Sequence, residues 1–127
     1  MEAHLELEEA AQAARERIGA PPDVGVVLGS GLGAWAESLG GVVKIPYAEI
    51  PFMPTSAVVG HAGNLCVGAA AGVRVACLQG RVHLYEGHAP ERVVFGVRLL
   101  ARLGCKAVVL TNAAGGIDAS MSPGDLM

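Results

Sequence analysis

Three short stretches of this chain contain the residue types that bind a small anion. They are residues 28–33 (LGSGLG), residues 80–87 (GRVHLYEG) and residues 111–116 (TNAAGG). Backbone N–H groups exposed in tight turns, a serine hydroxyl, a guanidinium and an imidazole can all donate hydrogen bonds to phosphate oxygens. The sequence therefore predicts a phosphate-type site assembled from three separate segments.

The middle stretch alternates polar and aliphatic residues. If it is extended, its period of two places Arg81, His83 and Tyr85 on one face. Arg81 would then be the bidentate phosphate ligand, and His83 could donate to a phosphate oxygen. Tyr85 would present a polar tip at the same rim. Glu86 could orient Arg81 or His83, or it could belong to a structural ion pair, since a carboxylate repels phosphate.

The outer stretches and one histidine complete the candidate site. The turn at residues 29–33 can hold one phosphate with its backbone N–H groups and the Ser30 hydroxyl. Residues 111–116 are small and follow an apolar run, so they can present backbone amides to a ligand. His61 lies between glycines in a predicted loop, a setting typical of an active-site edge. The alternatives are glycines that serve close packing and a surface histidine without a role.

Residues 29–34 also match the loose dinucleotide-binding pattern G-x-G-x-x-A. Glu49 follows Gly29 by twenty residues, as a ribose-binding acid should. Such a motif requires a strand that ends at the acid, but Pro46 and Pro51 flank Glu49 and break a strand there. The sequence therefore favours a single phosphate over a dinucleotide.

Composition limits the classes of function. The chain has 127 residues, of which 52% are hydrophobic and 17% charged, and this suits one globular domain with a core. The net charge is −3, no basic run is present, and aromatic residues make up 4%. Nucleic-acid binding is therefore not expected, because both the positive footprint and the stacking platform are missing.

Cysteine usage and the amino terminus predict a cytoplasmic protein. The three cysteines are odd in number and lie among apolar residues, as reduced core thiols of cytosolic proteins do. No His or Cys spacing suits zinc, so no metal site is expected. The first residues are acidic, and no apolar run approaches the roughly 18 residues of a membrane span. No membrane association is expected.

The hydrophobic pattern predicts an α/β fold in which a mixed β-sheet is flanked by helices. The expected elements are an amphipathic helix over 7–18, a buried strand over 24–28, a surface loop over 45–54, a hairpin of strands 64–69 and 73–78, a helix from Pro90 to Gly104 that buries Val93, Val97, Leu100 and Ala101, and a buried strand over 106–111. A turn signal at 122–125 is followed by the first residues of another strand. Residues 1–127 therefore read as the amino-terminal portion of one larger domain, with the carboxyl-terminal half absent.

Taken in order, these motifs resemble the trimeric class of purine nucleoside phosphorylases, within the nucleoside phosphorylase family. They are G-S-G-L-G at 29–33, E-I-P at 49–51, V-G-H-A-G at 59–63, Q-G-R-x-H-x-Y-E-G at 79–87 and T-N-A-A-G-G at 111–116. Val59 departs from the pattern, because a proline often precedes the Gly-His pair. Methylthioadenosine phosphorylases are less similar, because they typically carry T-T-A-C-G-S at the last motif.

The resemblance implies a role for each candidate residue. Ser30, Arg81, His83 and the backbone N–H of Ala113 would bind phosphate, Tyr85 would contact ribose, and His61 would lie at the edge of that site. His61 and His83 are the catalytic candidates.

The implied reaction is reversible phosphorolysis of a purine nucleoside to the free base and ribose 1-phosphate, a step of purine salvage. It needs no metal or organic cofactor, because phosphate is a co-substrate, and the complete enzyme would be a homotrimer. The base-binding residues of the family lie in the carboxyl-terminal half, so base preference is not set by this chain and the chain alone is expected to be inactive. The alternative is a non-catalytic phosphate- or nucleotide-binding α/β module.

Overall fold

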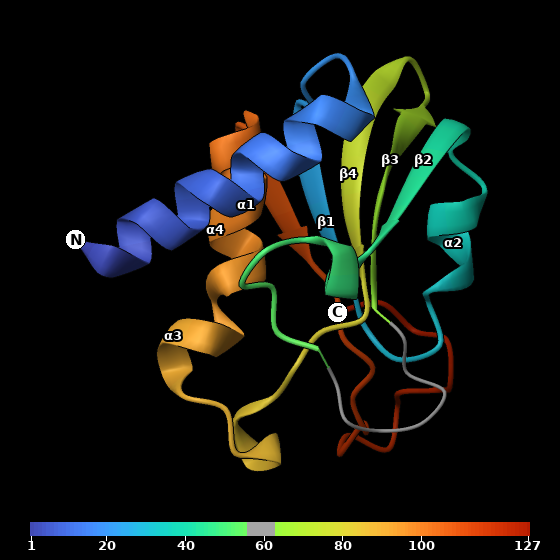
Figure 1. Ribbon diagram of the computed structural model, residues 1–127. Helices are drawn as coiled ribbons and strands as arrows, with labels where there is room; N and C mark the ends of the chain where they lie inside the picture. The colour runs from blue at the N-terminus through green and yellow to red at the C-terminus, as the bar shows by residue number, and fades with distance from the viewer. Residues whose placement is uncertain (56–62) are drawn as a thin grey trace.

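The computed structural model describes residues 1–55 and 63–127. The elements follow one another as α1 (Glu2–Ile18), β1 (Val24–Leu28), α2 (Ala34–Glu37), β2 (Gly40–Pro46), the 3-10 helix η1 (Tyr47–Glu49), β3 (Asn64–Ala70), β4 (Val73–Gln79), the 3-10 helix η2 (Leu84–Glu86), α3 (Pro90–Val93), α4 (Phe95–Leu103) and β5 (Ala107–Leu110). The strands form a sheet in the order β2-β3-β4-β1-β5 (Figure 1). β1 is parallel to β4 and β5, whereas β2, β3 and β4 are antiparallel. The prediction of an α/β fold with a mixed sheet is confirmed.

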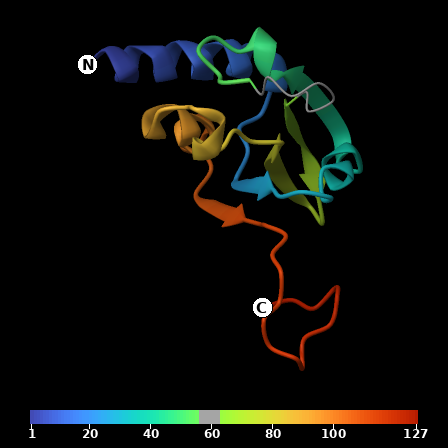
Figure 2. The same ribbon diagram turned by 90° about the horizontal axis from the view of Figure 1, so that it is seen from below.

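Helices cover both faces of the sheet (Figure 2). α1 and α4 pack on one face over a core that includes Val27, Leu65 and Leu78, and α2 packs on the other over Val26 and Cys77. Successive residues along β1, and along β4, thus point to opposite faces of the sheet and pack in different cores, as the period of two requires. The predicted first helix is confirmed, and it buries Ala10, Ala11, Ala14 and Ile18.

Three strands deliver the three candidate stretches to one edge of the sheet. β1 lies between β4 and β5 and runs parallel to both, with Leu28 opposite Gln79 and Val27 opposite Leu110. The carboxyl ends of parallel strands meet at the same edge, which is where α/β sheets bind ligands. The predicted strand over 24–28 and the predicted hairpin are both confirmed. This topology brings together segments that are far apart in the sequence.

The predicted surface loop over 45–54 is wrong in its first half. β2 continues to Pro46, and Ile45, Tyr47 and Ile50 are buried. Pro46 is tolerated because it is the last residue of an edge strand, where its missing N–H breaks no ladder. Glu49 lies in η1 and pairs with Arg17 at 3.1 Å, so it does not end a strand as a dinucleotide-binding acid would.

The second long helix is divided at Val94, and its buried face differs from the predicted one. α4 buries Phe95, Gly96, Leu99, Leu100 and Leu103. Leu100 was expected in the core, but Ala101 is exposed and Val97 only partly buried. The break turns the helix so that Gly96 faces the sheet, where an added Cβ would come within 2.8 Å of Leu78 Cδ1. Gly104 ends the helix with a left-handed φ of 115°, as predicted.

The strand predicted over 106–111 forms as β5 but is not buried. It is an edge strand, and Val109 and Leu110 are 50% and 66% exposed. The residues that follow it, 112–127, are all exposed and extend away from the sheet (Figure 2). An apolar run can therefore signal a strand without showing that both of its faces are covered.

Three thiols should make the free energy of unfolding fall as the pH becomes alkaline. Burial raises the pKa of Cys77 from 9.0 to about 12 and that of Cys105 to about 11, and it also raises the pKa of Cys66. Well below pH 9.0, the ordinary pKa of a thiol, these groups are protonated in both states and add no pH dependence. At higher pH the unfolded chain loses protons that the folded chain keeps, so the free energy of unfolding falls by up to about 1.4 kcal/mol per pH unit for each thiol.

Urea unfolding between pH 8 and pH 10 tests this prediction. Cys77→Ala should reduce the loss of stability with pH. Val75→Ala, a truncation at another buried position of β4, should lower stability equally at every pH. Identical pH slopes for Cys77→Ala and the unmodified chain would contradict the role assigned to this thiol.

Candidate active site

Thr111 joins the first and third candidate stretches. Its side-chain Oγ1 donates to the carbonyl of Val27 at 2.8 Å and accepts the N–H of Gly29 at 2.9 Å. Gly29 lies so close to the third stretch that an added Cβ would be 2.7 Å from the Cα of Asn112. The two loops are therefore packed backbone against backbone at the end of β1.

Arg81 joins the second stretch to the same residue. Its Nη1 donates to the carbonyl of Thr111 at 3.1 Å, and the side chain is exposed. A guanidinium has five N–H donors, so this bond leaves others for an anion. Thr111 thus contacts both of the other stretches, and the predicted convergence of the three segments is present in the structure.

Ser30 lies in the turn that begins at Gly29. The N–H of Leu32 donates to the carbonyl of Gly29 at 3.1 Å, and Gly31 adopts a φ of 83° that favours glycine. Ser30 is exposed, and the loop that contains it starts at the same edge of the sheet as the loop that contains Arg81, because Leu28 pairs with Gln79. Ala113 is likewise exposed, within two residues of Thr111.

Gln79 anchors the far end of this turn. Its Nε2 donates to the carbonyl of Gly33 at 2.9 Å, and its Oε1 accepts from Nδ2 of Asn64 at 3.0 Å. Gln79 is the last residue of β4. The side chain therefore ties the serine turn to the hairpin.

The alternation predicted for Arg81, His83 and Tyr85 is wrong beyond His83. The chain leaves β4 at Gly80, whose φ is 99°, and residues 84–86 form η2 instead of a strand. The turn nevertheless brings Tyr85 beside His83, because the two rings stack with centroids 4.9 Å apart and planes 10° from parallel. Tyr85 is 85% exposed, so its phenol remains accessible to a ligand.

Glu86 and His83 cap η2 reciprocally. The Glu86 carboxylate accepts the backbone N–H of His83 at 2.6 Å, and the backbone N–H of Glu86 donates to the carbonyl of His83 at 3.1 Å. The cap therefore fixes the backbone of His83 at the start of η2. This identifies one role of Glu86, which the sequence left open.

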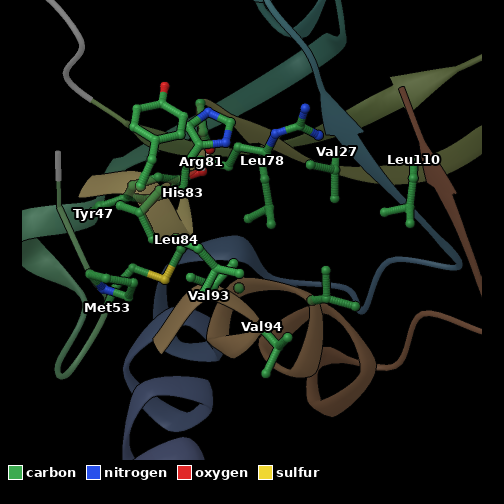
Figure 3. A pocket seen from close by; sticks show the side chains of 16 residues that line it. Val27, Tyr47, Met53, Leu78, Arg81, His83, Leu84, Val93, Val94 and Leu110 are labelled. Carbon is green, nitrogen blue, oxygen red and sulfur yellow. Dashed lines mark hydrogen bonds between the residues drawn. The ribbon is translucent and has the colours of Figure 1, made fainter. Parts of the chain in front are cut away.

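A cavity of about 590 Å³ lies between this loop, the sheet and the helices α3 and α4. Figure 3 shows Arg81 and His83 in its wall, with Val27, Leu78 and Leu110 along the sheet. Its lining is mostly aliphatic, as in sites that accept a ring or a sugar face. Among the described lining residues, Arg81 carries the only permanent charge. The cavity is therefore suited to an uncharged group attached to an anion.

Some expected features lie outside the described residues or stay predictions. His61 falls within residues 56–62, so its position is not described. Across residues 1–55 and 63–127, no group of three His, Cys, Asp or Glu could hold a metal ion. No helix in this part of the chain has both the length and the apolar character to cross a membrane.

Two residues of the site were missed at the level of sequence. Thr111 and Gln79 were assigned to motifs without a role of their own. Each is the residue at which a strand ends and a glycine-containing loop begins. A polar residue at that junction is the signal that could have identified them.

Comparison with known proteins identifies the family. The sequence profile of the phosphorylase superfamily matches residues 23–127. The chain belongs to this superfamily. Within it, the chain is 46% identical to purine nucleoside phosphorylase 1 of Geobacillus stearothermophilus over 121 residues, which are 95% of this chain and 44% of that protein. The resemblance stated from the motifs is thereby confirmed.

Solved structures of phosphorylases share the fold. A purine nucleoside phosphorylase in complex with ribose-1-phosphate superposes with a TM-score of 0.87 at 38% identity, covering 94% of this chain and 44% of that one. Isoform 2 of the Schistosoma mansoni enzyme, in complex with cytosine and ribose-1-phosphate, gives a TM-score of 0.88 at 35% identity, covering 96% and 43%. The chain thus spans less than half the length of the phosphorylases that it matches.

Proposed function

We propose that this chain supplies the phosphate-binding part and some of the ribose-binding part of an enzyme that cleaves purine nucleosides with phosphate. The observation that carries the proposal is the meeting of three anion-binding stretches at Thr111, which bonds to Gly29 on one side and Arg81 on the other. The names of the relatives, purine nucleoside phosphorylases from several organisms, support the reaction class.

The proposed phosphate ligands are the Ser30 hydroxyl, the Arg81 guanidinium, a ring N–H of His83 and the backbone N–H of Ala113. Together they would hold an anion of roughly −1.5 to −2 charge with charge-assisted hydrogen bonds. Donors from separate loops would also fix the orientation of the anion, because each would bind a different lone pair of its oxygens. The anion would then be held ready to react.

Cleavage of the glycosidic bond passes through an oxocarbenium-like state, in which the sugar carries positive charge. A phosphate held beside the anomeric carbon stabilises that charge and then forms the new bond to carbon, while the bond to the purine nitrogen breaks and its electron pair leaves with the base. Orientation of two bound reactants can supply effective molarities on the order of 10⁵ M or more. Tyr85 would contact the ribose, and His61 would lie at the edge of the phosphate and ribose site.

The remaining features of the proposal follow the family resemblance. The complete protein would be a cytoplasmic homotrimer of purine salvage that uses no metal or organic cofactor. Stabilisation of the departing base would come from residues outside this chain. The preference for one purine over another would accordingly also be set by residues outside this chain.

Two measurements test this function. Calorimetric titration with inorganic phosphate should show saturable binding to the chain, with a Kd on the order of 1 mM. Inosine and phosphate should give no hypoxanthine with the chain alone. Phosphate-dependent release of hypoxanthine is expected once a polypeptide corresponding to the rest of the Geobacillus relative is added. Phosphate binding without any release in the mixture would favour the non-catalytic module, and absence of binding would contradict both functions.

A further inference from the structure

One buried tyrosine connects the ends of three neighbouring strands. Tyr47 follows β2, Gly63 precedes β3 and Gly80 follows β4, and these strands are adjacent in the sheet. The N–H of Tyr47 donates to the carbonyl of Gly63 at 3.0 Å, and its phenol donates to the carbonyl of Gly80 at 2.5 Å. A single side chain thus reaches from the sheet edge, across β3, to the residue before Arg81.

Gly63 makes this reach possible because it has no side chain. A Cβ at Gly63 would lie 2.0 Å from Cδ2 and 2.1 Å from Cε2 of the Tyr47 ring, which is far inside van der Waals contact. The ring therefore lies directly on the Gly63 backbone. Gly80 is also close, since its own Cβ would be 3.6 Å from the Cα of Gly63.

The Tyr47 phenol is a permanent donor at this position. The residue is 3% exposed, and burial raises the pKa of the phenol far above its ordinary value. The O–H therefore stays protonated at any physiological pH and always donates to Gly80. The carbonyl that it holds belongs to a residue with a φ of 99°, at the point where the chain leaves β4 and turns into the Arg81 loop.

We propose that Tyr47 is a positioning residue of the anion site, which acts by fixing the Gly80 carbonyl and hence the direction of the chain at Arg81. The inference rests on the proposed phosphate site and adds to it a residue that does not touch the anion. Val82, which is buried, anchors the loop on the other side of Arg81. With both neighbours of Arg81 held, its backbone is fixed at the position from which the guanidinium donates to Thr111 and would reach the proposed anion.

The effect of the Tyr47 hydroxyl can be measured separately from the effect of the packing of its ring. Tyr47→Phe keeps the aromatic ring on Gly63 and removes only the bond to Gly80. We expect this variant to weaken inorganic-phosphate binding five- to tenfold. We also expect the backbone order parameters at Arg81 and Val82 to fall from about 0.85, typical of rigid backbone, to below about 0.6.

The matched control is Ile45→Val, which trims a buried residue two positions away without touching Gly80. It should lower stability but leave both the phosphate affinity and the order parameters at Arg81 and Val82 unchanged. Equal effects of the two variants, or unchanged order parameters in Tyr47→Phe, would overturn the positioning role. If the unmodified chain binds no phosphate, the proposed function is contradicted, and the order parameters still decide whether Tyr47 fixes the loop.

Discussion

Arg81→Ala is expected to weaken binding of inorganic phosphate by roughly 10- to 100-fold, because a hydrogen bond to a charged group is worth about 1.5–3 kcal/mol. The guanidinium is exposed and donates to the carbonyl of Thr111, so its removal leaves no buried charge without a partner. The fold should therefore survive, and the loss should be confined to the anion. Calorimetric titration with phosphate measures the change directly.

Arg98→Ala is the matched control, because it removes the same charge from an exposed position on α4. A similar loss of phosphate affinity in both variants would show that Arg81 acts only through the net charge of the chain. In an assembled enzyme, Arg81→Ala should raise the phosphate concentration required far more than it alters the preference among purines. Equal losses in both respects would count against a phosphate role.

Gly29→Ala should separate the serine turn from the third stretch. The added methyl group would lie 2.7 Å from the Cα of Asn112 and 3.0 Å from the carbonyl oxygen of Thr111, and both are backbone atoms that cannot rotate away. Overpacking of this kind typically costs about 1–3 kcal/mol. Because the N–H of Gly29 bonds to Thr111, phosphate affinity should fall together with the free energy of unfolding.

Gly115→Ala provides the comparison in the third stretch, because an added Cβ there meets no atom within 4 Å. Urea unfolding and phosphate titration of both variants give the two quantities. The close approach of the loops is supported if Gly29→Ala loses both stability and affinity while Gly115→Ala keeps them. Normal phosphate affinity in Gly29→Ala would show that the site does not need this contact.

The parts of the fold that could be predicted are those in which local pattern and environment agree. β1 is apolar throughout because it lies in the interior of the sheet, and its bounds were predicted to the residue. β2 was missed because Pro46, Pro51 and Pro54 were taken as breakers, although an edge strand tolerates Pro46 at its end. The buried face of α4 depended on a break at Val94 that no proline or glycine announces.

The candidate site also contains residues that could be predicted from the sequence and residues that could not. Side chains of the expected chemistry, Arg81 and His83, do lie at one edge of the sheet, because strand order places their loop there. Residues that hold the loops together, Thr111 and Tyr47, act through backbone carbonyls of distant segments. Such bonds depend on three-dimensional proximity, so a polar residue at the end of a strand can mark the position of Thr111 but the sequence does not show its partners. The course of the loop after His83 was also unpredictable, because the reciprocal cap with Glu86 replaces an extended conformation.

The most direct test of a shared phosphate site is a crystal structure of the chain grown with tungstate, a tetrahedral oxyanion with a strong anomalous signal. We expect one anomalous peak whose oxygens lie within hydrogen-bonding distance, about 2.7–3.2 Å, of both the Ser30 hydroxyl and the Arg81 guanidinium. Separate peaks at these two residues, or a peak that only one of them contacts, would contradict the shared site.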